Sequence, residues 1–94
     1  MTRQRRKISN SKVYHVIVKG IDDQDIFYDD QDRRYFLKQI LNLKKEINYD
    51  VYSYCLMTNH IHMVIKSEAK VLSKIMQSLM IRYVYYFNSR YERS

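Results

Sequence analysis

Residues 60–65 constrain the fold more than any other part of this chain. They read His-Ile-His-Met-Val-Ile, with no turn-forming residue after Asn59. As a strand with a period of two, this segment places His60, His62 and Val64 on one face, and its other three apolar residues point into a core. Two residues along a strand span about 6.6 Å, so both imidazoles can converge on one ion. Two interpretations are open: a metal site that acts on phosphate, or histidines on a solvated strand face.

Length and composition predict one small soluble domain. The chain has 94 residues, of which 46% are hydrophobic, an ordinary share for a folded protein. The single cysteine, Cys55, excludes an internal disulfide and suits a reducing cytoplasm. No apolar run approaches the roughly 18 residues of a membrane span, and the basic N-terminus lacks the apolar stretch of a signal peptide. We therefore expect a cytoplasmic protein with no membrane partner.

Charge is distributed unevenly along the chain. The net charge is +7, yet six of the ten acidic residues lie within residues 22–32. The remaining sequence carries 17 basic and four acidic side chains, a local balance of +13. Five of the basic residues form an acid-free arm at residues 1–12: Arg3, Arg5, Arg6, Lys7 and Lys12. Such arms often lie along a phosphate backbone, so we favour nucleic acid as the partner over the alternative of a solubilising tail.

Apolar periodicity predicts a strand and then a helix in the first half of the chain. Residues 13–18 are rich in β-branched and aromatic side chains and are followed by Gly20, the only glycine. Asp29 or Asp30 can cap a helix that starts near Gln31, and apolar residues then follow helical spacing as far as residue 47.

The second half predicts two strands and a second helix. Residues 51–58 read as a strand, and Asn59 marks a turn or bulge before the histidine strand. Residues 71–88 carry one apolar stripe at helical spacing. The resulting order, β-α-β-β-α, predicts an α+β ferredoxin-like domain over residues 13–94, with an antiparallel sheet that lacks its last strand.

At this point the chain resembles the single-tyrosine HUH transposases, especially their REP-associated branch. The resemblance covers nearly the whole chain in the right order, which is more specific than a His-x-His pair alone. The matching segments are Tyr14-His15-Val16-Ile17-Val18-Lys19-Gly20, Ile26-Phe27-Tyr28, Asp32 through Phe36-Leu37, Tyr54-Cys55-Leu56-Met57-Thr58-Asn59-His60-Ile61-His62-Met63-Val64, and Tyr83-Val84-Tyr85-Tyr86-Phe87-Asn88-Ser89-Arg90-Tyr91.

The resemblance implies a ferredoxin-like fold, usually dimeric, that acts on folded single-stranded DNA such as a hairpin. It also implies a Mg²⁺ or Mn²⁺ ion on His60 and His62 that polarises the scissile phosphate. In the family, a helix-borne tyrosine attacks this phosphate and leaves a 5′-phosphotyrosine and a free 3′-OH. Imidazole ligands tolerate several metals, so the two histidines do not identify the ion by themselves.

The chain departs from this family at its C-terminal end. The family's nucleophilic tyrosine, and often a third metal ligand, lie on a further helix beyond the position of Tyr91. We therefore expect no catalytic residue within the chain, a nucleophile beyond Ser94, and no cleavage by the 94 residues alone. The tyrosines of the second helix do not replace it, because Tyr83 falls on the apolar stripe and Tyr85 and Tyr86 match positions for packing and DNA contact.

Other candidate sites have simpler interpretations. His15 alternates with the apolar residues of its strand and so lies on the other face, which predicts a hydrogen-bonded histidine near the site rather than a third ligand. The six aspartates of residues 22–32 are more simply a helix cap and dipole partner than a Mg²⁺ site. Cys55 has no CxxC partner and is predicted to be a buried small hydrophobe. Met57 and three other methionines read as core filling.

The predicted DNA contacts combine the arm with three residues of the folded part: Arg3, Arg5, Arg6, Lys7, Lys12, Lys19, Arg82 and Arg90. The favoured hypothesis is a hairpin-binding transposase domain that acts in DNA transposition. One alternative is a non-catalytic DNA-binding remnant of such a transposase, and another is an RNA-binding or scaffold module with idle histidines. The sheet edge left by the missing strand also predicts a homodimer formed by sheet extension or strand exchange.

Overall fold

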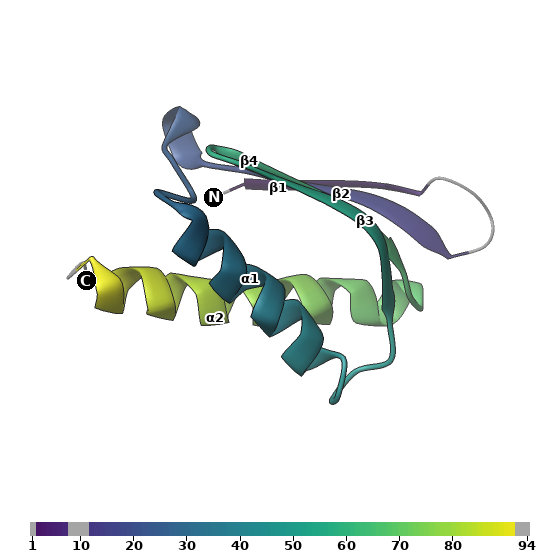
Figure 1. The fold of residues 1–94 in the computed structure, drawn as a ribbon. Coiled ribbons are helices and arrows are strands. Elements are labelled where there is room, and N and C mark those ends of the chain that lie inside the picture. The colour runs from purple at the N-terminus through teal and green to yellow at the C-terminus, as the bar shows by residue number, and fades with distance from the viewer. Residues whose placement is uncertain (1, 8–11, 92–94) are drawn as a thin grey trace.

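The fold is one antiparallel sheet with both helices on one face. The computed structural model describes residues 2–7 and 12–91, and the elements run in this order: β1 (Thr2–Lys7), β2 (Val13–Lys19), the short 3₁₀ turn η1 (Ile21–Asp23), α1 (Asp30–Leu43), β3 (Asp50–Met57), β4 (His60–Lys66) and α2 (Ala69–Arg90). The strands pair antiparallel in the spatial order β1-β2-β4-β3. Figure 1 shows α1 and α2 below the sheet, so among the described elements no helix covers its other face. This arrangement confirms the predicted α+β, ferredoxin-like order from β2 to α2.

The edge strand β1 is an element that the sequence did not predict. Its backbone pairs with β2 from Thr2 opposite Lys19 to Lys7 opposite Tyr14. In a complete ferredoxin-like sheet the final strand pairs with the first strand of the β-α-β unit, so β1 holds the edge where that strand belongs. The polar sequence of β1 shows no apolar alternation, and the free backbone groups of β2 provide the pairing instead. Residues 2–7 lie within the basic arm that we assigned to residues 1–12, and that division of the chain stays a prediction.

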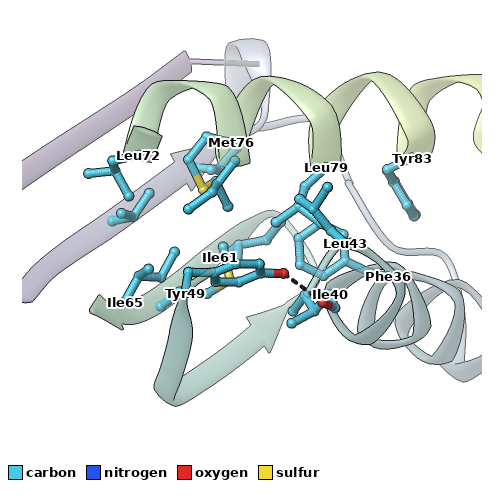
Figure 2. Close-up of a cluster of buried hydrophobic side chains, with 14 of the residues drawn as sticks. Phe36, Ile40, Leu43, Tyr49, Ile61, Ile65, Leu72, Met76, Leu79 and Tyr83 are labelled. Carbon is cyan, nitrogen blue, oxygen red and sulfur yellow. Dashed lines mark hydrogen bonds between the residues drawn. The ribbon is translucent and has the colours of Figure 1, made fainter. Parts of the chain in front are cut away.

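Alternating side chains of the two central strands form the upper layer of the core. The buried residues of β2 and β4 are Tyr14, Val16, Val18, Ile61, Met63 and Ile65. They pack on one face of each helix, with contributions from Phe36, Ile40, Leu43, Leu72, Ile75, Met76, Leu79 and Tyr83 (Figure 2). The alternation seen in the sequence of residues 60–65 is therefore confirmed as a buried face and an open face.

Helix α1 begins where the sequence predicted a cap. Asp29 is the N-cap, and its side chain accepts a hydrogen bond from the backbone N–H of Asp32 at 3.1 Å. After the helix ends at Leu43, the buried hydroxyl of Tyr49 donates to the carbonyl oxygen of Ile40 at 2.6 Å, which ties the start of β3 to the end of α1 (Figure 2). Burial raises the pKa of Tyr49 to about 12, so this hydroxyl stays protonated.

A register shift in β3 decides which of its side chains share a face with β4. The pairing changes between Val51 and Ser53, and Tyr52 is the extra residue. Beyond the shift, Ser53 lies opposite Val64 and Cys55 lies opposite His62. Directly opposite residues of an antiparallel pair point to the same face. Cys55 therefore shares the open face with the histidine.

Candidate metal centre

The two histidines of β4 lie on the open face of the sheet, opposite the helices. His60 and His62 are half-buried, and the residues that alternate with them are fully buried under α1 and α2. The centroids of the two imidazole rings are 4.8 Å apart. The structure therefore brings together the two residues that the sequence singled out, on an accessible surface.

Each of these imidazoles has one ring nitrogen engaged by a neighbour. Nδ1 of His60 lies 2.7 Å from Oδ1 of Asn59, and Nδ1 of His62 lies 3.3 Å from Nε2 of His15. Within the described part of the chain, Nε2 of His60 and Nε2 of His62 have no hydrogen-bond partner. Histidines that bind metals commonly use one nitrogen for the ion while the other donates to a neighbour. Within the described part of the chain both Nε2 atoms are thus available as donors to an ion, and His15 is the hydrogen-bonded neighbour that was expected from its position in the strand.

The electrostatics around His62 favour its neutral form. Burial lowers the pKa of His62 below its ordinary value of 6.5, and the neighbouring charges of His60, His15 and Lys19 lower it further. Neutral imidazole is the form that binds metals, so this shift keeps the ring competent at neutral pH. Among residues 12–91, no group of three or more His, Cys, Asp or Glu side chains is arranged to hold a metal. The two imidazoles therefore supply only part of a coordination sphere.

A shallow hollow of about 390 Å³ opens beside the histidines. It is lined by Ile17, Lys19, Asp23, Asn59, His60 and His62. Lys19 is exposed and forms no ion pair among the described residues, so it contributes a positive charge to a surface where Asp23 supplies the one carboxylate of the lining. Asp22 and Asp23 both have left-handed backbone conformations, with φ of 53° and 59°, in the turn that borders the hollow. The site thus combines imidazoles with a cation, a combination suited to a phosphate group.

Main-chain hydrogen bonds hold the turn that precedes His60. The backbone N–H of Gly20 donates to the carbonyl oxygen of Asn59 at 3.0 Å. The N–H groups of Ile26 and Phe27 both donate to the carbonyl oxygen of Thr58, at 2.7 and 3.1 Å. A Cβ at Gly20 would overlap the carbonyl oxygen of Gln24, so glycine is required there for close backbone approach.

Arg33 reinforces the same turn from α1. Its Nε donates to the carbonyl oxygen of Leu56 at 3.0 Å, and its Nη2 donates to the hydroxyl of Thr58 at 3.3 Å. The guanidinium also lies over the ring of Phe27, 5.5 Å from its centroid. No local pattern in the sequence singles out Arg33, because its contacts join segments that are more than 20 residues apart.

The predicted DNA-contact residues occupy four kinds of environment. Four of them belong to β1, whose backbone pairs with β2: Arg3, Arg5, Arg6 and Lys7. Lys12 and Arg82 form surface ion pairs with Glu68 and Glu46, at 2.6 and 2.8 Å. Lys19 lines the hollow beside the histidines. The remaining residue, Arg90, lies in a separate cluster at the junction of the helices.

This second cluster joins the start of α1 to the end of α2, and no pattern in the sequence predicted it. We call it the Asp32 cluster, formed by Asp29, Asp32, Tyr86, Arg90 and Tyr91. The carboxylate of Asp32 is 0% exposed and accepts four hydrogen bonds. Two come from the backbone N–H of Tyr28 at 2.9 Å and from Nη1 of Arg90 at 2.6 Å. The other two come from the hydroxyls of Tyr86 and Tyr91, at 2.7 and 2.8 Å. Arg90 also forms a bidentate ion pair with Asp29, in which Nη1 donates to Oδ1 and Nη2 donates to Oδ2, each at 2.8 Å. Its guanidinium is thus already paired with carboxylates.

Protonation within the Asp32 cluster follows from these contacts. The hydrogen bond from Arg90 lowers the pKa of Asp29 to about 2. Burial raises the pKa of Asp32, but its hydrogen bonds outweigh burial and the net shift is downward. Burial, together with the Asp32 carboxylate, raises the pKa of Tyr86 and raises that of Tyr91 to about 12. These two phenols are therefore poor nucleophiles where they stand.

The tyrosines of α2 are separated from the histidines by the sheet itself. Tyr83, Tyr85 and Tyr86 belong to α2, and Tyr91 is its C-cap, whereas the histidines face away from both helices. Tyr83 is buried, as predicted, and its hydroxyl donates to the carbonyl oxygen of Ile26 at 2.6 Å. Tyr85 is 75% exposed. None of these four side chains shares a face of the sheet with the candidate ligands.

Two sequence-based predictions are wrong. Cys55 is exposed rather than buried, and Met57 is 44% exposed rather than part of the core. Both residues lie on the outer strand β3 and share the open face with His60 and His62, where no described helix covers them. Met63 and Met76 are buried as predicted.

Comparison with known proteins identifies the family of this chain. The model of the family described as "Transposase IS200 like" matches residues 8–94. No curated protein and no solved structure matches the chain significantly. In the described residues, no helix is long and apolar enough to cross a membrane. Since the family model spans nearly the whole chain, the protein belongs to the IS200-like transposase family.

Proposed function

We propose that this domain binds structured single-stranded DNA and holds Mg²⁺ or Mn²⁺ on His60 and His62 for tyrosine-mediated strand cleavage and rejoining in DNA transposition. One observation carries the metal assignment: the two imidazoles lie side by side on an open face, each with Nδ1 engaged and with no hydrogen-bond partner for Nε2 among the described residues. Membership of a transposase family supports DNA as the partner.

The chemistry assigns roles to three side chains of the hollow. A divalent ion, when bound, neutralises charge on phosphate oxygens and orients the substrate. His60 and His62 hold the ion, and Lys19 adds positive charge where a DNA phosphate would lie. The attacking tyrosine oxygen forms a bond to phosphorus, and the bond to the 3′ oxygen breaks, so that the phenol loses a proton and the 3′ oxygen gains one. The bond between tyrosine and phosphorus retains the energy of the broken phosphodiester bond, which is then available for rejoining the strands.

We further propose that the nucleophilic tyrosine is supplied from outside residues 1–94. This follows from the position of the α2 tyrosines across the sheet and from the raised pKa values of Tyr86 and Tyr91. The same observations favour a second candidate function, DNA binding without cleavage. Incubation with a labelled hairpin in Mn²⁺ separates the two: a covalent adduct formed by the chain alone would contradict the external nucleophile.

Calorimetry with Mn²⁺ tests the metal assignment directly. We expect weak binding by the wild type, because only two protein ligands are present, and no heat with the double variant His60→Ala/His62→Ala. Ser53→Ala is the matched control, because Ser53 lies exposed on the same face of the sheet but offers no imidazole. Equal heats for the wild type and the double variant would refute the site and favour a scaffold or RNA-binding role with idle histidines.

Salt dependence tests the DNA proposal. The basic surface predicts a steep fall of log affinity with log salt, and a hairpin with unpaired flanks should bind better than a blunt duplex of equal length. Deleting the arm would also remove β1, so we prefer to replace the charges: Arg3→Gln, Arg5→Gln, Arg6→Gln and Lys7→Gln together. Each lost phosphate contact should reduce the slope by about 0.7. Equal affinity for duplex and hairpin would contradict the preference for structured single strands.

Assembly remains part of the proposal. With β1 on one side of β2 and β4 on the other, the outer strands of the sheet are β1 and β3. An outer strand offers unpaired backbone groups to a second copy, and a small domain gains from burying them. We therefore propose a homodimer formed through these edges. A monomeric mass in sedimentation velocity at micromolar concentration would refute it.

A further inference from the structure

We propose that Asn59 and His15 are positioning residues, which fix His60 and His62 as Nδ1–H tautomers and so leave both Nε2 lone pairs available to one divalent ion. This inference rests on the proposed metal role of the two histidines. It concerns two residues that would not touch the ion themselves but decide which nitrogen of each ligand is free to do so.

The tautomer of His60 follows from the chemistry of its neighbour. The carboxamide oxygen of Asn59 carries no hydrogen, so in the 2.7 Å contact with Nδ1 of His60 it can only accept. Nδ1 of His60 is then the donor, and in a neutral ring the lone pair is on Nε2. The choice between two nearly equivalent nitrogens is thereby made by the residue that directly precedes the ligand in the sequence.

His15 makes the same choice for His62 through the sheet. His15 and His62 belong to the adjacent strands β2 and β4, and their near nitrogens are 3.3 Å apart. If Nδ1 of His62 donates, Nε2 of His15 accepts, and the proton of His15 is on its own Nδ1. Because 3.3 Å is longer than 2.7 Å, we expect His15 to hold His62 less firmly than Asn59 holds His60.

The position of Asn59 is fixed by the rest of the fold. Its carbonyl oxygen accepts from Gly20, and the preceding Thr58 accepts from the N–H groups of Ile26 and Phe27. Arg33 adds a contact from α1 to the hydroxyl of Thr58. The carboxamide is therefore attached to a turn that is held from several directions, and the orientation of His60 is set before any ion arrives.

Loss of such supporting contacts typically costs 10- to 100-fold in metal affinity or activity. We expect Asn59→Ala to weaken Mn²⁺ binding by roughly this factor, and His15→Ala to weaken it by less. Asn59→Asp should restore most of the affinity, because a carboxylate oxygen can also accept from Nδ1–H. Asn48→Ala is the matched control, since Asn48 is an exposed asparagine in the α1–β3 connection.

The decisive experiment measures the ring nitrogens in the metal-free protein. Long-range ¹H–¹⁵N correlation spectra distinguish the two tautomers, and for His60 and His62 in the wild type we expect protonated Nδ1. In Asn59→Ala the signals of His60 should shift toward the Nε2–H form, while those of His62 stay in place. The spectra of the remaining residues report whether each variant is folded.

The outcomes separate this inference from the function on which it rests. Nε2–H tautomers in the wild type, or an Asn59→Ala variant with unchanged tautomer and unchanged Mn²⁺ affinity, would overturn the inference even if the metal binds. Nδ1–H tautomers in a protein that binds no Mn²⁺ would instead refute the metal function and leave the tautomer assignment standing.

Discussion

The Asp32 cluster and the histidine surface are built from similar polar groups, yet they differ in how many of those groups are satisfied. In the cluster, the fully buried carboxylate of Asp32 receives four donors and Arg90 bridges two carboxylates. On the open face, His60 and His62 are half-buried, and each has a partner on one ring nitrogen and none described on the other.

The difference indicates what each region contributes. A buried polar network with every member paired stabilises one arrangement and leaves no site for a ligand. A partly satisfied pair of imidazoles on an open face contributes little to folding but retains lone pairs for an ion. Substitutions in the two regions should therefore change different measurements, stability in one and binding in the other.

The largest effect is expected in the Asp32 cluster. Asp32→Ala would leave two tyrosine hydroxyls without their acceptor and would break the ion pair of Arg90 with a buried carboxylate, so that Arg90 keeps only Asp29. This should cost about 3–5 kcal/mol in the free energy of unfolding. Asp30→Ala is the matched control, because the side chain of Asp30 is 82% exposed and its only described ion pair is with Arg33 at the surface. Urea denaturation measures both. If Asp32→Ala does not fold, Tyr86→Phe removes a single hydrogen bond to the same carboxylate and should cost about 1.5–3 kcal/mol.

Removing the histidines should give the opposite result. His60→Ala/His62→Ala is expected to change the free energy of unfolding by only about 0.5 kcal/mol per site, while it abolishes Mn²⁺ binding. A loss of stability comparable with that of Asp32→Ala would show that the histidine surface is a structural element, and the contrast between the two regions would then fail.

Gly20→Ala should change both the stability of the fold and the binding of metal. The new methyl group would overlap the carbonyl oxygen of Gln24 and displace the loop that hydrogen-bonds Asn59. Crowding of this kind typically costs about 1–3 kcal/mol, and we also expect weaker Mn²⁺ binding because His60 loses its fixed orientation. Ile21→Ala, at the exposed neighbouring position, serves as the control. Unchanged metal affinity in a destabilised Gly20→Ala would separate the loop from the site.

Acid should weaken the two regions in different pH ranges. Asp29 has a pKa of about 2, lowered chiefly by Arg90, and the pKa of Asp32 is also below 3.8. Their ionised forms stabilise the fold above pH 3.8, and this stability is lost as the pH falls toward 2. Asp29→Asn should flatten the stability curve in this range, as measured by thermal denaturation from pH 5 to pH 2. If the stability of Asp29→Asn fell with pH in parallel with that of the wild type, the acid-dependent stability could not be assigned to Asp29.

The pKa of His62 predicts a smaller effect nearer neutrality. Because this pKa is below 6.5 in the folded state, the unfolded chain binds the proton more readily, and stability declines as the pH falls below 6.5. Mn²⁺ affinity should decline over the same range, because the proton competes with the ion. His62→Ala should remove this part of the stability profile and leave the acid part below pH 3.8 intact.

The smallest effect on stability is expected at Cys55. Its thiol is exposed and lies opposite His62 on the open face, so alkylation with iodoacetamide should change the free energy of unfolding by no more than about 0.5 kcal/mol. The added group would nevertheless crowd the histidines and lower Mn²⁺ affinity. Cys55→Ser treated with the same reagent is the control. Strong destabilisation on alkylation would show that this face packs against another part of the assembly.

The sequence by itself determined the features that depend on local periodicity and on short-range chemistry. Alternation in residues 60–65 predicted which face of β4 is buried, and carboxylates ahead of an apolar stripe predicted a cap of α1 at Asp29 or Asp30, of which the structure has Asp29. The pairing of His60 with His62 follows from the same period of two. These predictions needed only neighbours within a few residues, which is why they agree with the structure.

Only the tertiary structure decided the features that depend on contacts across the chain. A polar segment became the strand β1 because β2 offered a free edge, and Cys55 is exposed because its strand is outermost and its face uncovered. The Asp32 cluster joins Asp32 to Arg90, 58 residues away, and the contact of His15 with His62 spans 47 residues. Burial and polar partners of this kind are set by register and packing, and no short-range pattern encodes them.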